Sequence, residues 1–270
     1  MATLDKYRVN PKNFSLSNYK TDDKTERSGS KEQDSYELTR LATEINALQD
    51  TLQAAGKRKV LLVLQGMDAS GKDGTVRHVF SECDPLGIRL ASFKAPSSDE
   101  LAHDYLWRVH QQVPKAGELV IFNRSHYEDV LIVKVHDWID DAECQRRYAQ
   151  INDFERLLAE TGTTIIKCYL HISREEQKQR MQERLNDPTK TWKFNPNDLK
   201  ERALWSKYMQ AYEAAIKATS TDYAPWHIIP ADSKTNRNLL ISRLLLDALK
   251  GMKLKYPPVP AEYKSIVIAD

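Results

Sequence analysis

A glycine-rich loop stands directly after a compact apolar stretch of the chain. Residues 59–65 (KVLLVLQ) are almost all apolar, which is typical of a strand buried on both faces of a parallel sheet. The next seven residues, Gly66 to Lys72, match the first seven positions of the pattern G-x-x-x-x-G-K-[ST], and a helical pattern follows at 75–80. A strand, this loop and then a helix are the context in which the pattern binds phosphate. The sequence therefore predicts a P-loop fold.

The loop carries groups that suit a phosphate ligand. Its glycines let backbone N–H groups turn toward an anion, and the N-terminus of the following helix adds a positive dipole. The ammonium group of Lys72 can neutralise the transferred phosphoryl group. The phosphate-binding residues expected in this segment are Gly66, Ala69, Ser70, Gly71, Lys72, Asp73 and Gly74.

Two carboxylates accompany the loop. Asp68 lies inside it, and Asp73 stands where the pattern has Ser or Thr, so the usual hydroxyl ligand for Mg²⁺ is missing. Carboxylates repel phosphate unless a hard cation lies between them, so they indicate Mg²⁺, with Mn²⁺ as a possible substitute. Asp73 has the alternative role of stabilising the helix N-terminus. We expect Asp68 to be a catalytic and metal-binding residue.

Strand and helix patterns alternate along the rest of the chain. Further strands are expected at 88–93, 118–122, 163–172 and 226–229, and helices at 37–52, 96–112, 141–160, 174–185, 198–219 and 235–250. This alternation predicts βαβ units. The expected fold is α/β, with three layers and a central parallel sheet flanked by helices.

The length and composition of the chain limit which domain organisation and which partners we expect. The 270 residues suit a polar N-terminal extension at 1–30, one kinase domain at 31–255 with a helical lid at about 174–200, and an extended Pro-containing tail at 256–270. A net charge of +2 implies no bulk attraction to nucleic acid or membrane. The three cysteines are widely spaced, and no apolar stretch is long enough to span a bilayer. We expect a cytoplasmic protein without nucleic-acid or membrane partners.

Charged residues follow the third expected strand. Ligands of open parallel sheets bind at the carboxyl ends of the strands, so Arg124, Glu128 and Asp129 should join Asp68 and Lys72 there. Arg124 can bind phosphate through two N–H groups. Glu128 and Asp129 are expected to bind a second Mg²⁺ or to orient the acceptor, and the alternative is that they are ordinary acids at a helix start.

The segment after the second strand is where P-loop nucleotide kinases hold the acceptor. The expected nucleotide-binding residues are Lys94, Asp104, Arg108, Asn123 and Arg124. The alternative for Asp104 and Arg108 is an i, i+4 surface pair.

Basic residues are concentrated between 178 and 193. Arg180 and Arg184 are four residues apart and share one helix face, and Lys193 lies in the polar loop beyond. Such a segment is typical of a mobile lid that closes over phosphates and excludes water. The alternative is a solvated basic face.

The chain resembles the family-2 polyphosphate kinases in several long blocks. These are KVLLVLQGMDASGKDGT, APSSDELAHDYLWRVHQQVP, GELVIFNRSHYEDV, LHISREEQKQRMQERLNDPTKTWKF and APWHIIPADSK, in that order. The resemblance implies a thymidylate-kinase-like fold and Mg²⁺-dependent phosphoryl exchange between inorganic polyphosphate and nucleotides, with functional Asp68 and Lys72. Many members have Asp where this chain has Asn123. The Asn form, followed by Glu128 and Asp129, is similar to the subgroup that accepts nucleoside mono- and diphosphates.

Two other functions remain open from the residues alone. An ATP-dependent nucleotide kinase needs the same P-loop and lid, and only the resemblance favours polyphosphate with AMP, ADP, GMP or GDP. A P-loop switch or nucleic-acid-binding module is less favoured, because the chain has no guanine-selecting N-K-x-D and no aromatic-basic stacking platform. The apolar faces at 37–52 and 239–246 can serve a homo-oligomer, as a dimer or tetramer, or only the core.

Overall fold

A five-stranded parallel sheet forms the centre of the structure, a computed structural model that describes residues 4–268. The strands are β1 Lys59–Gln65, β2 Ile88–Ser92, β3 Leu119–Asn123, β4 Thr163–His171 and β5 Trp226–Pro230. Their order is β2-β3-β1-β4-β5, so β1 is central and pairs in parallel with β3 and β4. Because all strands run in the same direction, their carboxyl ends meet at one edge of the sheet.

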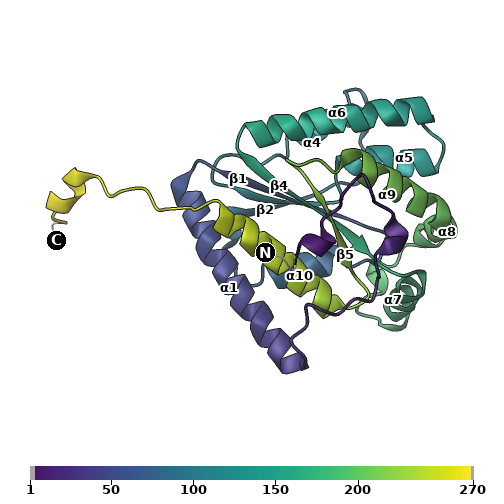
Figure 1. The fold of residues 1–270 in the computed structure, drawn as a ribbon, viewed down its shortest axis with the longest axis horizontal. Helices are drawn as coiled ribbons and strands as arrows, with labels where there is room; N and C mark the ends of the chain where they lie inside the picture. Colours follow the sequence, from purple (N-terminus) through teal and green to yellow (C-terminus); the bar gives the residue numbers. More distant parts are fainter. Residues whose placement is uncertain (1–3, 269–270) are drawn as a thin grey trace.

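Helices cover both faces of this sheet. One layer contains α1 Lys31–Ala55, α2 Lys72–Val79 and α10 Lys234–Gly251, which contact one another. The other contains α5 Ile132–Val135, α6 Asp141–Glu160 and α9 Trp205–Thr219. In Figure 1, α6 lies above the sheet and α1 and α10 lie below it. The predicted three-layer α/β fold with a parallel sheet is confirmed.

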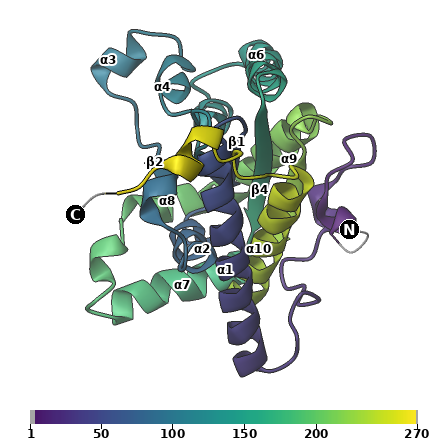
Figure 2. The same cartoon turned by 90° about the vertical axis from the view of Figure 1, so that its left-hand side faces the viewer.

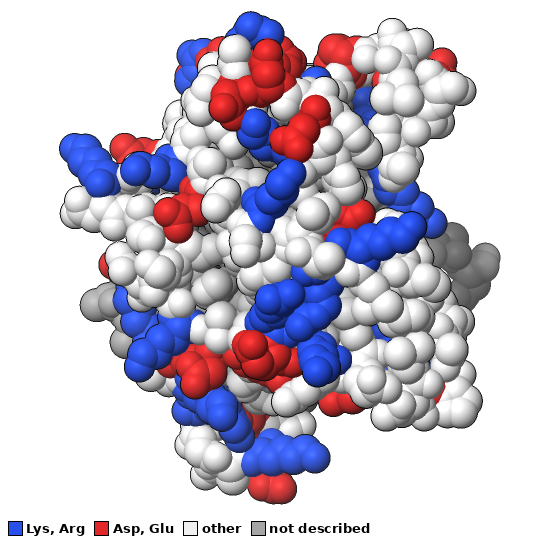
Figure 3. Space-filling view, turned by 90° about the vertical axis from the view of Figure 1, so that its right-hand side faces the viewer, with Lys and Arg blue, Asp and Glu red and all other residues white. Residues whose placement is uncertain are grey.

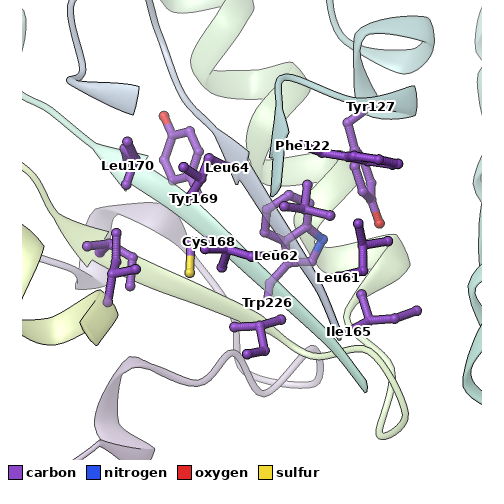
Figure 4. Close-up of a cluster of buried hydrophobic side chains, with 14 of the residues drawn as sticks. Leu61, Leu62, Leu64, Phe122, Tyr127, Ile165, Cys168, Tyr169, Leu170 and Trp226 are labelled. Atoms are coloured by element: carbon purple, nitrogen blue, oxygen red, sulfur yellow. The ribbon is translucent and has the colours of Figure 1, made fainter. Parts of the chain in front are cut away.

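Apolar strands account for the core. The side chains from Val60 to Leu64 are all buried, which explains the unbroken apolar run of β1. Figure 4 shows Leu62 of β1 among buried side chains of the neighbouring strands, which include Phe122 of β3, Tyr169 of β4 and Trp226 of β5. The core therefore holds the central strand, and with it the loop at its carboxyl end, in a fixed position.

The helix expected at 96–112 is wrong in its length. Two short helices, α3 Ser98–Leu101 and α4 Trp107–His110, replace it, and α3 projects at the edge of the molecule (Figure 2). Between them, Asp104 Oδ1 accepts a hydrogen bond from the backbone N–H of Leu106 at 2.9 Å. A carboxylate that takes a nearby backbone N–H competes with the helical hydrogen bonds, so the helix breaks at this point.

A second break divides another of the expected helices. The helix expected at 198–219 is divided into α8 Asn197–Ala203 and α9, because Leu204 leaves helical geometry and packs against the core. The segment before this break contains α7 Arg174–Asn186 and a 3₁₀ turn, Thr191–Lys193. Another 3₁₀ turn, His126–Val130, follows β3 where the sequence shows no clear pattern.

The N-terminal segment packs against the domain more closely than its polar composition indicates. The side chains of Tyr7, Val9, Phe14 and Leu16 are buried in the main core. The backbone N–H of Val9 donates to the carbonyl oxygen of Trp226 at 2.9 Å, so the segment lies along the edge strand β5. A few well-spaced apolar residues are therefore enough to attach a polar segment.

The chain leaves the domain after α10. Residues 253–268 run away from the body of the molecule (Figure 1). This tail exposes the apolar side chains of Val259, Ile266, Val267 and Ile268. Within residues 4–268 no helix has the length and apolarity that crossing a membrane requires.

Candidate active site

The glycine-rich loop joins β1 to α2 at the carboxyl edge of the sheet. Gly66 and Gly71 have φ angles of 153° and 103°, and Ala69 also has a positive φ of 63°. A Cβ atom on Gly66 would lie 2.9 Å from the carbonyl oxygen of Leu170, too close for any side chain. The loop therefore needs glycine at this position in order to curl around an anion.

Lys72 is buried at the start of α2. Its Nζ donates to the carbonyl oxygens of Gly66 and Met67, at 2.7 and 3.2 Å. Burial, together with the positive charge of the neighbouring Arg124, lowers the pKa of Lys72 to about 8. A phosphate group beside this ammonium would favour the charged form, so the site is arranged for an anion.

Arg124 and Asp68 form an ion pair beside the loop. Arg124 Nη2 lies 2.6 Å from Asp68 Oδ1. The backbone of Arg124 is left-handed, with φ of 61°, and its N–H donates to the carbonyl oxygen of Leu64. Burial opposes the charge of Arg124, but the carboxylates of Glu128 and Asp68 outweigh that effect and raise its pKa. The predicted meeting of β1 and β3 residues at this edge is thus observed.

A polar cavity of about 150 Å³ opens at this pair. Asp68, Arg124 and Glu128 line it from the sheet side. The residues that line it from the segment 195–201 and from α9 were not foreseen from the sequence: Asn195, Asn197, Asp198, Glu201, Tyr208 and Tyr212. Burial raises the pKa of Asp198, and the charge of Asp68 adds to this effect.

Two carboxylates of the cavity suit a divalent cation. Within the described residues, no three acidic, His or Cys side chains are already gathered as a metal site. Mg²⁺, however, is commonly held by one or two carboxylates together with phosphate oxygens and water. Asp68 and Glu128 line the same cavity and fit this arrangement.

Asp129 is not among the residues that line this cavity with Asp68 and Glu128. Its Oδ2 lies 3.6 Å from Nη2 of Arg108, and burial raises the pKa of its carboxyl group. Arg108 is itself buried and donates to the carbonyl oxygen of Lys94 at 2.9 Å. The alternative of a surface pair between Asp104 and Arg108 is therefore wrong, and the expected metal or acceptor role of Asp129 stays a prediction.

The segment after β2 borders a second cavity. Lys94, Arg108 and Glu100 line this space of about 360 Å³, together with Gln111 and Gln112. Asp104 is exposed and caps a turn, so it is not among the lining residues. Two of the three residues expected to bind nucleotide in this segment thus share a cavity.

The three expected lid cations, Arg180 and Arg184 of α7 and Lys193 of the following 3₁₀ turn, lie in different surroundings. Arg180 is buried, and its guanidinium donates to carbonyl oxygens of the P-loop, at 3.0 Å for both Ala69 and Ser70. It cannot contact polyphosphate as the expected lid cation. Arg184 is half-buried and lies 3.8 Å from Asp198 of the cavity wall, while Lys193 lies over the exposed Trp192 ring.

Charge gathers on the face that carries α5, α7 and α8. Figure 3 shows this face, with Lys and Arg side chains across its middle and acidic side chains beside them. A face of mixed charge with a basic centre suits a polyanion bound together with a divalent cation.

The fold and these groups define a P-loop phosphotransferase of the kinase type. The chain belongs to the polyphosphate kinase 2 family, whose pattern it matches over residues 28–257. It is 52% identical over 266 residues to the AMP/ADP-polyphosphate phosphotransferase of Meiothermus ruber, a match that covers 98% of this chain and all of that protein. It is 41% identical over 246 residues to the ADP-polyphosphate phosphotransferase of Rhodopseudomonas palustris, covering 86% of this chain and 85% of that protein.

A solved structure agrees with this assignment. The crystal structure of polyphosphate kinase 2 from Arthrobacter aurescens TC1 superposes with a TM-score of 0.93 at 45% identity. The match covers 97% of this chain and 94% of that one. The chain is therefore a polyphosphate kinase that transfers phosphoryl groups between polyphosphate and nucleotides.

Proposed function

We propose that this polyphosphate kinase uses AMP and ADP as acceptors, forming ADP and ATP, and that GMP and GDP are weaker acceptors. The observation that carries the proposal is the position of Lys72 beside the Asp68–Arg124 pair, which itself lines a polar cavity. The similarity to an AMP/ADP-polyphosphate phosphotransferase supports both acceptors. The presence of Asn123, followed by Glu128 and Asp129, also supports the use of both mono- and diphosphate acceptors.

The reaction needs position and charge more than proton transfer. An ionised phosphate oxygen of the nucleotide attacks the terminal phosphorus of polyphosphate. A new P–O bond forms while the bridging P–O bond to the next phosphate breaks, and its electron pair stays on the shortened chain. No protein base is required, because the attacking oxygen is already ionised. Lys72, Arg124 and the loop N–H groups act by holding and neutralising the transferred phosphoryl group.

Magnesium is part of the proposal. Asp68 and Glu128 would hold the ion, because both line the cavity beside the loop. When bound, Mg²⁺ neutralises phosphate charge and orients the chain. Mn²⁺ also prefers oxygen ligands and should replace it. Asp129 is left out because its carboxylate pairs with Arg108.

We also propose a cytoplasmic homo-oligomer. Cys83, Cys144 and Cys168 form no disulfide, which suits a reducing compartment. The apolar tail at 253–268 is exposed along most of its length, and such a segment commonly packs on another subunit. Light scattering of the full chain and of a chain ending at residue 252 would test the oligomer, since the shorter chain should fall to a smaller species.

A donor and acceptor matrix tests the function. The purified protein is incubated with Mg²⁺, with either long-chain polyphosphate or ATP as donor, and with each of AMP, ADP, GMP and GDP. Polyphosphate should convert AMP to ADP and ADP to ATP, with less product from the guanine nucleotides. Lys72→Ala is the control for contaminating kinases. Transfer from ATP to AMP without any transfer from polyphosphate would instead establish an ATP-dependent nucleotide kinase.

A further inference from the structure

Two buried arginines donate to backbone carbonyl groups of the P-loop, and neither is among the residues that line the cavity beside it. Arg180 comes from α7 and Arg237 from the first turn of α10. Each donates to the carbonyl oxygen of Ser70, at 3.0 Å from Arg180 Nη1 and 3.1 Å from Arg237 Nη1. One backbone oxygen of the loop thus accepts hydrogen bonds from two guanidinium groups.

Among the residues that the structure describes, Arg237 has no acidic partner. Arg180 pairs with Glu176 at 2.8 Å, but within residues 4–268 no carboxylate lies within 4.0 Å of Arg237. Its other bonds go to the amide oxygen of Asn238, at 2.9 and 3.1 Å. Burial lowers the pKa of Arg237, and the charge of Arg180 lowers it further.

The surroundings of Arg237 destabilise its positive charge. It is almost completely buried, it lies beside a second arginine, and it occupies the N-terminal turn of α10, where the helix dipole is positive. The contact with the loop is also tight, because a Cβ on Gly71 would lie 1.9 Å from Arg237 Nη1. A buried charge without a partner is strongly destabilising, so a ligand that balanced it would stabilise the folded protein.

The negative charge that would balance Arg237 is expected on the opposite side of the Ser70–Gly71 peptide. The carbonyl of Ser70 and the N–H of Gly71 belong to one planar trans peptide and therefore point in opposite directions. When the arginines hold the carbonyl, the N–H of Gly71 is turned toward the side that receives phosphate. Hydrogen bonding of the carbonyl to a cation also polarises that N–H group.

We propose that Arg237 is a positioning residue for the donor: its buried charge acts through the Ser70–Gly71 peptide and is balanced only when a polyphosphate chain occupies the loop. Arg180 supports the same peptide but has Glu176 as a partner, so the unbalanced charge is that of Arg237. This inference concerns donor binding, and the identity of the nucleotide acceptor does not enter it.

Three substitutions of Arg237 distinguish the effect of its positive charge from the effect of its planar, hydrogen-bonding shape. Arg237→Met and Arg237→Gln are neutral, and Gln keeps an N–H donor for the Ser70 carbonyl. Arg237→Lys keeps the charge without the planar fork. Arg243→Met is the matched control, because Arg243 lies on the same helix but pairs with Glu26, which precedes α1, and with Glu37 of α1.

The first measurement is thermal melting with and without inorganic tripolyphosphate. Without ligand, both neutral variants should melt no lower than the wild-type protein, since an unpaired buried charge has been removed. The increase in Tm caused by tripolyphosphate should fall to less than about half of the wild-type increase, because binding stabilises the folded state in proportion to affinity. Arg237→Lys should keep most of that increase, and Arg243→Met should keep all of it while lowering the ligand-free Tm.

The second measurement is steady-state kinetics. The KM for polyphosphate should rise about tenfold in the neutral variants, the size expected for losing one charge-assisted interaction. The KM for ADP should stay within about twofold, since the proposal places Arg237 only behind the donor loop. If Arg237→Met does not fold, Arg237→Gln serves alone. Two outcomes would overturn the proposal. The first is that Arg237→Gln and Arg237→Lys show equal KM values for polyphosphate and equal Tm increases with tripolyphosphate. The second is that the neutral variants lose ligand-free stability but keep the tripolyphosphate increase.

Discussion

Asn123 Nδ2 donates a hydrogen bond to Asp73 Oδ1 at 2.8 Å, and this bond joins the end of β3 to the start of α2. The amide accounts for two departures from common patterns at once. The first departure is Asp73, which stands where the P-loop pattern has Ser or Thr. The second is Asn123, which stands where many members of the family have Asp, and a carboxylate there would lie against the Asp73 carboxylate. An amide at this position lets the Asp73 carboxylate remain close to the phosphate site without a second negative charge.

Asn123→Asp tests this relationship. Two carboxylates at hydrogen-bonding distance repel each other, so the variant should need more Mg²⁺ for half-maximal rate, by about tenfold. Its activity at fixed Mg²⁺ should recover partly as the pH is lowered and one carboxyl group is protonated. Asn123→Ala removes the hydrogen bond without adding charge and is the control. If both variants show the same Mg²⁺ dependence, charge at position 123 is unimportant.

Lys72 should govern both turnover and the pH dependence of donor binding. Lys72→Ala should lower kcat by at least about a hundredfold with the fold intact, because the ammonium stabilises charge that develops in the transition state. In the wild-type enzyme the pKa of Lys72 is lowered to about 8 by burial. As the pH rises through that value the free enzyme loses this charge, so the KM for polyphosphate should rise above pH 8. The bound donor favours the charged form, so kcat should change less over the same range.

A well-folded Lys72→Ala enzyme with near-normal turnover would remove Lys72 from the site. Circular dichroism and melting in the absence of ligand establish folding. A flat KM profile between pH 7 and pH 9.5 would show that another group neutralises the donor.

The strands and the loop were predictable because their signals are local. The run from Val60 to Leu64 is apolar without interruption, and the turn at Gly66 follows it directly. The parallel sheet then places Arg124 beside Asp68, so the centre of the site follows from topology. Helix lengths were less predictable, since the breaks at Asp104 and Leu204 depend on one side-chain hydrogen bond and one tertiary contact.

The direction of each charged side chain was not predictable. Spacing shows that Arg180 and Arg184 share a helix face, but it does not show that the first turns inward to the P-loop and the second lies near Asp198. Asp129 and Arg108 are separated by 21 positions in the chain, and only the folded structure brings them together at 3.6 Å. Arg237 has no sequence signal, because it lies in an otherwise ordinary amphipathic helix.

Asp68 should act through Mg²⁺. Asp68→Asn keeps the size of the side chain but removes a charge from the ion pair with Arg124 and from the cavity. We expect a loss of at least about a hundredfold in rate, together with a weaker response to Mg²⁺. A rate measured across a Mg²⁺ titration checks both effects. Wild-type activity that persists in EDTA would contradict a metal role for Asp68 and Glu128.

Arg184 and Arg180 should behave differently when each is replaced by Gln. Arg184 is half-buried at the cavity wall, so Arg184→Gln should raise the KM for polyphosphate, flatten its dependence on salt and leave Tm almost unchanged. Arg180→Gln removes buried hydrogen bonds to four carbonyl groups and should lower the free energy of unfolding, by about 2–4 kcal/mol.

These two changes are measured by urea unfolding and by polyphosphate kinetics at increasing KCl concentration. Lys178→Gln on the exposed part of α7 is the control for loss of one positive charge from the same helix. The salt slope of donor binding reports how many cations contact the polyanion. It should fall in Arg184→Gln and remain at the wild-type value in Lys178→Gln. If Arg184→Gln instead unfolds at lower urea with unchanged polyphosphate kinetics, its pairing with Asp198 is structural and the donor contacts lie in the loop around Lys193.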